Sequence, residues 1–407
     1  MSTLKYWIWL TTRKGLQGRA ALRVLEWFGT PEQAFFADPS EYIHVPNLTE
    51  QERNALKDHD LTGANVILGD CERLGIRIMT YQDAAYPERL RNIYDPPLVL
   101  YVKGKPIPFD EKVVIGMVGT RNCTPYGVKM AGKIALELAR SGAVIVSGIA
   151  EGIDAACIRA ALKGGGTVVS VLGGGIDVHY PWRNSDLYED VAAVGALISE
   201  YPPGTRPLGA HFPVRNRIIS GLSLGVVVVE SDVTGGSMRT VEHVEDQSRD
   251  LFAVPGPADS SASAGTNQLI REGSAKLVAD GWDVLEEYMD RYPGALQRKE
   301  PLSSEAEASR LEHPESVKAG KTEQPKREEQ PVDDRIPWSE LRDKLTDDQR
   351  DILLALEEKP RIADELVELT QIPTRRILSA LTILEVQGYV TQEPGKRFRA
   401  LVKLKME

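Results

Sequence analysis

Four short runs of apolar, mostly β-branched residues stand in the middle of the sequence, with helical periodicity between them. The runs are 113–118, 144–146, 167–172 and 226–229. None of them alternates apolar with polar residues, so each must be buried on both faces. Strands of this kind separated by helices are typical of a parallel sheet covered on both sides. The sequence therefore predicts an α/β fold with a doubly wound parallel sheet, which we assign to residues 101–290.

A smaller helical segment precedes the predicted sheet, at residues 1–100. Its turn signals include a first-turn proline at Pro31 and the capping-box sequence Thr49 to Glu52. The turn at 45–48 lies between two predicted helices and indicates a SAM-like or helix-hairpin-helix unit. A plain helical domain that packs on its neighbour is the alternative.

Two further segments follow the predicted sheet. Residues 296–336 are rich in Glu, Lys, Pro, Ser and Gln and have no apolar periodicity, so we expect a disordered linker. Residues 340–405 have the pattern of three helices and a β-hairpin, which is typical of a winged helix-turn-helix domain.

Composition excludes several classes of protein. No run approaches 18 apolar residues, so no membrane span is expected, and the N-terminus does not resemble a signal peptide. The three cysteines, Cys71, Cys123 and Cys157, lie far apart, which disfavours disulfides and cysteine zinc sites and favours a cytoplasmic location. Because the formal net charge is −10, any nucleic-acid site must be a local patch.

Glycine-rich loops follow the first three apolar runs. In a doubly wound sheet such loops gather at the carboxyl edge of the strands, where ligands bind. Glycine lets the backbone approach a phosphate, helix N-termini attract it, and arginine adds a fork of donors. The residues expected at this phosphate site are Gly119, Thr120, Arg121, Ser147, Gly148 and Gly152. A third loop contains glycines 173–175.

A stretch without any carboxylate extends from Tyr201 to Val229. Cations placed around an aromatic ring suit a single nucleic-acid strand, since arginines bind phosphates while the ring stacks on a base. The members of this group are Arg206, His211, Phe212, Arg215 and Arg217. The alternative is that Phe212 belongs to the core and that the arginines pair with acids elsewhere.

The sequence contains no recognisable catalytic motif. The first glycine-rich loop lacks the G-x-G-x-x-G spacing, so no dinucleotide cofactor is expected, and the histidines show no metal-ligand spacing. Glu200 and Glu230 each end a predicted strand and could form a carboxylate pair for acid–base work. The alternative is that they hold arginines or backbone amides in place. His179 and His243 are expected to be structural.

Several of these stretches resemble the DNA-processing protein A family (DprA, also called Smf), bacterial binders of single-stranded DNA in natural transformation. The matching stretches are 118–121, 126–127, 147–155, 180–181, 199–201, 212–219, 254–256 and 265–267. The string F-P-x-R-N-R-I-I at 212–219 is long and rarely met by chance. The resemblance is strong over residues from about 80 to 285 and looser at both ends.

The resemblance implies an extended Rossmann-like domain that forms a homodimer, protects incoming single-stranded DNA and loads the RecA recombinase onto it, without catalysis or cofactor. Carried over by position, the residues facing the strand would be Arg121, Ser147, Gly148, Phe212, Arg215, Asn216 and Arg217. We expect Arg121 and Arg215 at loop tips. Two stretches depart from the family pattern, Cys157-Ile158 and Thr234 to Arg239; the second would alter the rim of the site.

Two other functions stay open. Thr234-Gly235-Gly236 with Glu242 loosely resembles the signature of lonely-guy-type nucleotide phosphoribohydrolases, although three signature residues are replaced. A transcription regulator acting through residues 340–405 would make the sheet domain a ligand sensor. A role as transcription regulator would not explain the string F-P-x-R-N-R-I-I at 212–219.

Overall fold

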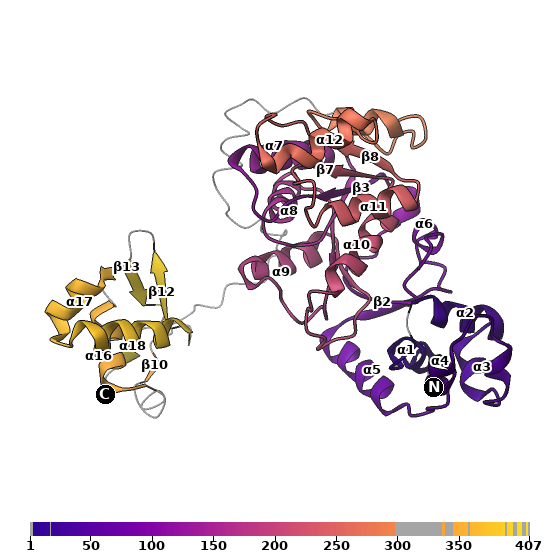
Figure 1. Cartoon of the computed structure of the whole chain (residues 1–407), viewed down its shortest axis with the longest axis horizontal. Coiled ribbons are helices and arrows are strands. Elements are labelled where there is room, and N and C mark those ends of the chain that lie inside the picture. Colours follow the sequence, from indigo (N-terminus) through magenta and orange to yellow (C-terminus); the bar gives the residue numbers. More distant parts are fainter. Residues whose placement is uncertain are drawn as a thin grey trace, which may run out of the picture. The chain divides into compact units, whose positions relative to one another are not determined.

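The predicted parallel sheet is present, and it is larger than the sequence indicates (Figure 1). Among the described residues of the first unit, nine strands form one sheet in the order β1-β2-β6-β5-β4-β3-β7-β8-β9. Neighbours from β6 to β9 along this order are parallel, whereas β2 is antiparallel to both β1 and β6. The bounds are β1 (Arg77–Thr80), β2 (Val99–Gly104), β3 (Val114–Val118), β4 (Val144–Ser147), β5 (Val168–Leu172), β6 (Ala196–Ser199), β7 (Gly225–Val228), β8 (Asp250–Ala253) and β9 (Lys276–Leu277).

The computed structural model divides the chain into two units, residues 1–320 and 321–407. It describes residues 3–16, 18–297, 336–337, 345–356, 359–386, 389–393, 397–400 and 404–405. The predicted linker at 296–336 lies almost entirely outside these described residues. In the described part, no helix is long and apolar enough to cross a membrane.

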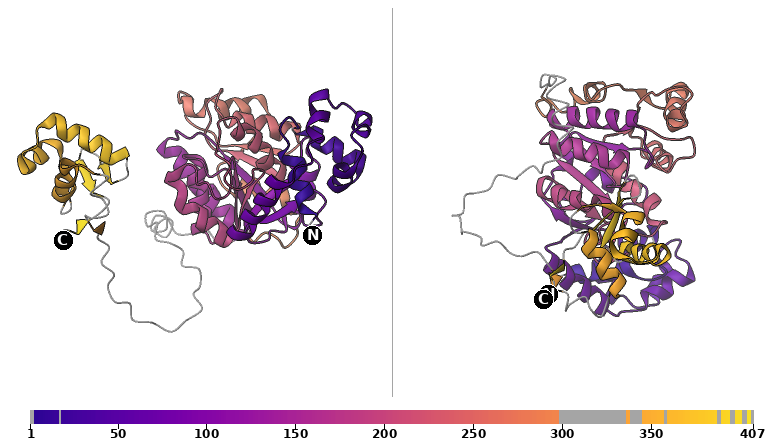
Figure 2. Two further views of the ribbon diagram at one scale, coloured as in Figure 1. Left: turned by 90° about the horizontal axis from the view of Figure 1, so that it is seen from below. Right: turned by 90° about the vertical axis from the view of Figure 1, so that its left-hand side faces the viewer.

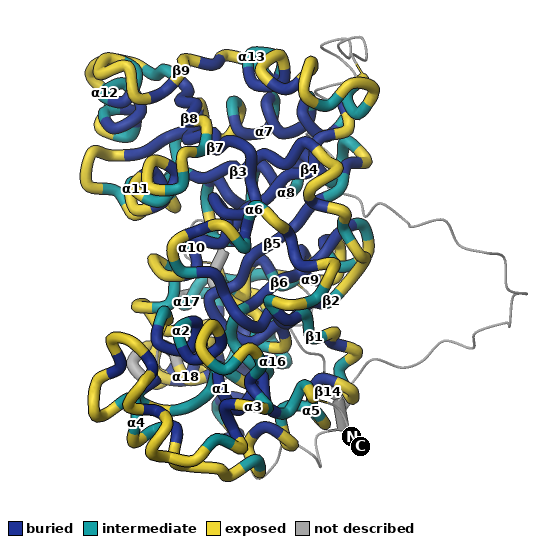
Figure 3. The backbone as a smooth tube through the Cα atoms, turned by 90° about the vertical axis from the view of Figure 1, so that its right-hand side faces the viewer, coloured by how far each residue is buried: buried dark blue, intermediate teal, exposed yellow. Residues whose placement is uncertain are grey.

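Helices cover both faces of the sheet, and each face has its own apolar core (Figure 3). One face carries α7 (Pro125–Arg140), α8 (Ile153–Lys163), α9 (Ser185–Val194) and α13 (Trp282–Leu285); the other carries α6 (Glu88–Arg91), α10 (His211–Leu222), α11 (Met238–Asp246) and α12 (Ala264–Glu272). Strand β3 contributes Ile115 and Met117 to the first core and Val114 and Val118 to the second. The doubly wound α/β fold is confirmed.

The sequence located four strands as apolar runs, predicted β6 as the strand that ends at Glu200, and missed the others. The runs at 113–118, 144–146, 167–172 and 226–229 correspond to β3, β4, β5 and β7. Strands β1 and β2 were missed because they lie in a segment dominated by helical periodicity. The predicted domain boundary after residue 100 falls inside β2, whose partner β6 belongs to the middle of the sheet.

In the described part of the chain, five α-helices precede β1, and Figure 1 shows them grouped at the end of the sheet where β2 lies. They are α1 (Leu4–Thr12), α2 (Arg19–Phe28), α3 (Pro31–Phe36), α4 (Glu50–Leu56) and α5 (Thr62–Leu74). The capping box is confirmed: the Thr49 hydroxyl accepts from the Glu52 amide, and the Glu52 carboxylate accepts from the Thr49 amide. Buried side chains of these helices, among them Trp9 of α1, belong to the same apolar core as Tyr101 of β2. The SAM-like or helix-hairpin-helix assignment stays a prediction.

The second unit has the predicted winged-helix pattern (Figure 2). The helices described in this unit are α16 (Asp347–Leu356), α17 (Ala363–Thr370) and α18 (Thr374–Val386). Strands β11 (Arg361–Ile362), β13 (Arg397–Ala400) and β12 (Val390–Glu393) form an antiparallel sheet in that order. At the start of α16 the Thr346 amide donates to the Gln349 side chain at 2.8 Å, as a capping box requires.

Candidate nucleic-acid interface

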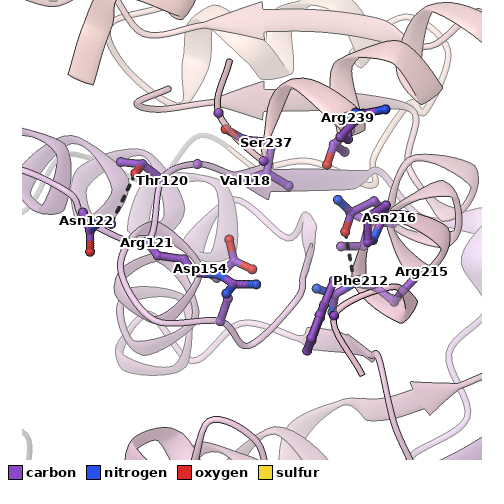
Figure 4. A pocket seen from close by; sticks show the side chains of 18 of the residues that line it. Val118, Thr120, Arg121, Asn122, Asp154, Phe212, Arg215, Asn216, Ser237 and Arg239 are labelled. Carbon is purple, nitrogen blue, oxygen red and sulfur yellow. Dashed lines mark hydrogen bonds between the residues drawn. The ribbon is translucent and has the colours of Figure 1, made fainter. Parts of the chain in front are cut away.

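A pocket of about 580 Å³ opens at the carboxyl edge of the central strands (Figure 4). Three segments supply most of its lining: the loop after β3, the first turns of α10, and the segment that leads from β7 into α11. The rest of the lining comes from Ala150, Asp154, Tyr180, Pro207 and Gly209. A second pocket, of about 340 Å³, adjoins it and shares Arg121, Tyr180 and Phe212 with the first. The edge is the one expected for ligands of a doubly wound sheet.

A buried carboxylate fixes the loop after β3. Glu230, which follows β7, accepts hydrogen bonds from the Thr124 amide at 2.9 Å and from the Thr124 hydroxyl. The Glu230 carbonyl accepts from the Thr120 amide at 2.8 Å. Thr124 in turn caps α7, because its side-chain oxygen accepts from the Gly127 amide at 3.1 Å. Glu230 therefore holds backbone amides in place. This is the alternative role that the sequence indicates for Glu230 beside acid–base work.

Gly152 brings the loops after β3 and β4 into contact. Its φ of +80° is a conformation that residues with a side chain rarely adopt. A Cβ atom at this position would lie 2.4 Å from the carbonyl oxygens of Thr120 and Arg121. The Ile153 amide also donates to the Thr120 carbonyl at 3.2 Å. Gly152 thus serves the packing of two loops and lines neither pocket.

Replacing Gly152 by alanine should destabilise the first unit by about 2–4 kcal/mol, since backbone strain and the two carbonyl clashes add. Gly165→Ala is the matched control, because Gly165 has a φ of +71° with open space around it. That variant should lose only about 1 kcal/mol. Denaturant midpoints of both variants test this, and equal losses would contradict the close approach of the loops.

Arg121 and Phe212 lie at the junction of the two pockets. Within the described residues, the exposed Arg121 guanidinium forms no hydrogen bond or ion pair, and it lies 5.3 Å from the centre of the Phe212 ring. Phe212 is half-buried, with Tyr180 5.6 Å away between ring centres. A Cβ atom on Gly173 would lie 2.9 Å from the Phe212 ring, so the ring rests directly on this backbone.

Arg215 is not at a loop tip, and that expectation is wrong. It lies in the second turn of α10 and is 4% exposed. Its guanidinium donates to the carbonyl of Gly148 at 3.0 Å and to that of Val171, both at the ends of strands. Burial lowers the pKa of Arg215, and burial raises the pKa of neighbouring Asp154, while each charge partly offsets the effect on the other. Arg215 therefore joins strand ends, and it also lines the larger pocket.

Arg217 lines neither pocket and is 7% exposed. It donates to the carboxylates of Glu200 at 2.7 Å and Asp95 at 3.3 Å. Burial alone would lower the pKa of Arg217, but the two carboxylates raise it above its ordinary value. For this residue the alternative of pairing with acids elsewhere is confirmed.

Of the remaining predicted site residues, four line one of the pockets and Ser147 lines neither. Gly119, Thr120 and Asn216 line the larger pocket, and Gly148 lines the smaller one. Ser147 lines neither, because it is fully buried and its hydroxyl donates to the Met117 carbonyl at 2.8 Å.

The third glycine-rich loop is filled by protein, so it offers no open cradle for a phosphate. A Cβ atom on Gly174 or Gly175 would lie within 3 Å of the segment 202–205 that crosses above it. His211 also contacts the Gly173 carbonyl at 3.0 Å through its Nδ1 atom.

Sequence reasoning placed the stretch Thr234 to Arg239 at the rim of the site without naming a contact for it, and it missed Trp182 and Arg183. The loop 232–240 lines the larger pocket with Asp232, Ser237 and Arg239, and Tyr180, Trp182 and Arg183 line the smaller one. An aromatic residue followed by a cation in the stretch Tyr180 to Arg183 was the available signal. Among the described residues, no group of three or more His, Cys, Asp or Glu side chains is placed to hold a metal ion.

A pocket at the carboxyl edge of a Rossmann-like sheet is typical of ligand-binding α/β proteins. Comparison with known proteins shows to which family of this class the chain belongs. The family model described as DNA recombination-mediator protein A matches residues 77–289, and the DprA winged helix domain matches residues 339–396. The chain belongs to the DNA recombination-mediator protein A family.

Individual relatives agree with this assignment. DNA processing protein DprA of Bacillus subtilis is 38% identical over 263 residues, which span 63% of this chain and 88% of that protein. Protein Smf of Synechocystis is 31% identical over 97% of this chain and 98% of its own length. The crystal structure of DNA processing protein A from Streptococcus pneumoniae superimposes with a TM-score of 0.63 and 35% identity, covering 70% of this chain and 99% of that one.

Proposed function

We propose that the first unit binds single-stranded DNA across the two adjoining pockets. The observation that carries this proposal is the exposed Arg121 guanidinium, unpaired within the described residues, beside the half-buried Phe212 ring. A cation for the phosphate and a ring for the base are the two elements of single-strand binding. In a duplex the bases are stacked and paired, so they could not reach the ring without disruption.

The fuller role follows the family resemblance and the names of the relatives, which describe DNA processing. We propose that the protein acts in the cytoplasm as a homodimer, protects incoming single-stranded DNA during natural transformation, and loads the RecA recombinase onto it. It needs no cofactor and performs no catalysis in this proposal.

Fluorescence anisotropy with labelled single-stranded and duplex DNA, over a salt series, tests the binding proposal. Single-stranded DNA should bind more tightly, and the affinity should fall with salt with a log–log slope of about −0.7 per phosphate contacted. Equal affinity for duplex, or an affinity that is indifferent to salt, would overturn it.

Removing the Phe212 ring should weaken single-strand binding by about 1–3 kcal/mol, the range for one stacked base. Phe212→Ala is the test variant, and Phe212→Tyr should retain most of the affinity because it keeps the ring. Phe36→Ala is the control, since Phe36 on α3 is 69% exposed and lies outside both pockets. If Phe212→Ala binds like the parent, the ring makes no contact with a base.

The phosphoribohydrolase alternative finds less support in the geometry. Glu242, the carboxylate of the loosely matching signature, is exposed, lies 3.8 Å from Arg239 of the same helix and does not line the pocket. A hydrolase would need this group to face its substrate.

The winged helix should contribute little to single-strand affinity. Its first helix carries three acids, Asp347, Asp348 and Asp351, and one cation of the unit, Arg376, is already paired with Asp348 at 2.6 Å. Deleting residues 330–407 should therefore change the affinity by less than about tenfold, or roughly 1.4 kcal/mol. A hundredfold loss in the anisotropy assay would make the winged helix a principal DNA-binding element and favour the transcription-regulator alternative.

A further inference from the structure

An exposed tryptophan lines the smaller pocket. Trp182 is 76% exposed, although a large aromatic side chain is usually at least half buried. A single exposed apolar residue needs no explanation on its own. Trp182, however, shares its pocket with Arg121, Tyr180 and Phe212, the residues at the junction with the larger pocket.

The turn that carries Trp182 is held from both sides. Trp182–Asn184 is a short 3-10 turn, and the buried Asn184 amide donates to the carbonyls of Ile149 and Ala150 at 3.0 and 3.1 Å. Just before the turn, the hydroxyl of buried Tyr188 accepts from the Tyr180 amide and donates to the Tyr180 carbonyl, each at 3.0 Å. The ring is therefore presented on a fixed backbone, which lowers the entropy cost of binding.

Aromatic and cationic groups continue from the larger pocket into the smaller one. The Tyr180 ring lies 5.6 Å from the Phe212 ring, and Trp182 follows two residues later. Arg183 is exposed and, within the described residues, has no hydrogen-bond or ion-pair partner for its side chain. Among the described residues that line this pocket, Glu151 is the one carboxylate, beside the two cations Arg121 and Arg183 in the same lining.

We propose that the smaller pocket is a second base-stacking subsite, in which Trp182 stacks on a base and Arg183 binds a phosphate of the same strand. This subsite rests on the proposed single-strand binding and extends it by at least one nucleotide beyond Phe212. An aromatic face accepts any base, so the subsite adds affinity without sequence preference.

Thermodynamic cycles between protein and DNA test the subsite directly. Parent protein, Trp182→Ala and Trp182→Phe are each titrated with oligothymidylates in which one abasic position is moved along the strand. Trp182→Ala should weaken binding of the intact strand by roughly fivefold to a hundredfold, and Trp182→Phe should recover most of that loss. At the stacked position, the abasic site and Trp182→Ala should be non-additive.

Two further variants sharpen the result. Glu151→Gln removes the opposing charge and should tighten binding, while Trp27→Ala, which removes a half-exposed tryptophan on α2 outside both pockets, should leave binding unchanged. Additive effects at every abasic position, or parent-like binding by Trp182→Ala, would overturn the subsite. If the parent itself failed to bind single-stranded DNA, the proposed function would fail first, so the two failures are distinguishable.

Discussion

Reversing the charge of Arg121 should weaken single-strand binding by about a hundredfold or more, which corresponds to at least ~2.7 kcal/mol. Arg121→Glu removes a guanidinium at the junction of both pockets and puts a repelling carboxylate where a phosphate is expected. The fold should not suffer, because Arg121 is exposed and has no hydrogen bond or ion pair within the described residues. Anisotropy titrations and thermal unfolding of the same preparation measure both effects.

The matched control for this variant is Arg73→Glu. Arg73 lies near the end of α5, is largely exposed and pairs with Asp70 at 2.9 Å, a surface contact that contributes little. The substitution Arg73→Glu changes the net charge by the same amount as Arg121→Glu, at a position outside both pockets. If Arg73→Glu lost as much affinity as Arg121→Glu, overall charge rather than a local site would explain the binding.

Arg215→Glu should unfold or severely destabilise the first unit, by about 3–5 kcal/mol. The new carboxylate would be buried against the carbonyl oxygens of Gly148 and Val171, which accept from Arg215, and close to the buried Asp154. A loss of DNA binding in this variant would therefore report on folding. A loop-tip position, as expected for Arg215 from the sequence, would instead have left the fold intact.

The control substitution lies in the same carboxylate-free stretch. Arg206 is exposed and unpaired within the described residues, so Arg206→Glu should unfold at the parent's denaturant midpoint. Chemical denaturation of the two variants compares the same chemical change at a buried and an exposed position. A parent-like midpoint for Arg215→Glu would show that the strand-end contacts contribute little to stability.

The strands that form the middle of the sheet could be predicted because burial on both faces leaves a mark in the sequence itself. Runs such as Val113 to Val118 have no polar alternation, so their environment follows from composition. Strands β1 and β2 lie at one side of the sheet, where β2 pairs antiparallel with β1 and with β6. The β2–β6 pairing joins residues about a hundred positions apart, which local periodicity does not report.

The site divides in the same way. The position of Arg121 followed from its place after an apolar run, since loops that follow parallel strands meet at one edge. The burial of Arg215 and Arg217 could not be predicted, because their partners are distant in the sequence. Arg215 donates to the carbonyls of Gly148 and Val171. Arg217 donates to the carboxylates of Asp95 and Glu200. A charged residue in a helix has no local feature that distinguishes a solvent-facing cation from one paired in the interior.

The antiparallel attachment of β2 to β6 affects how the chain is made. Strand β2 ends at Gly104 and β6 begins at Ala196, so about 90 residues are synthesised between them. At about 5–20 residues per second, β2 leaves the ribosome several seconds before its partner. During that interval one side of β2 has unpaired amides and carbonyls, a template for pairing with another nascent chain. A fragment ending before β6 would keep this side open permanently.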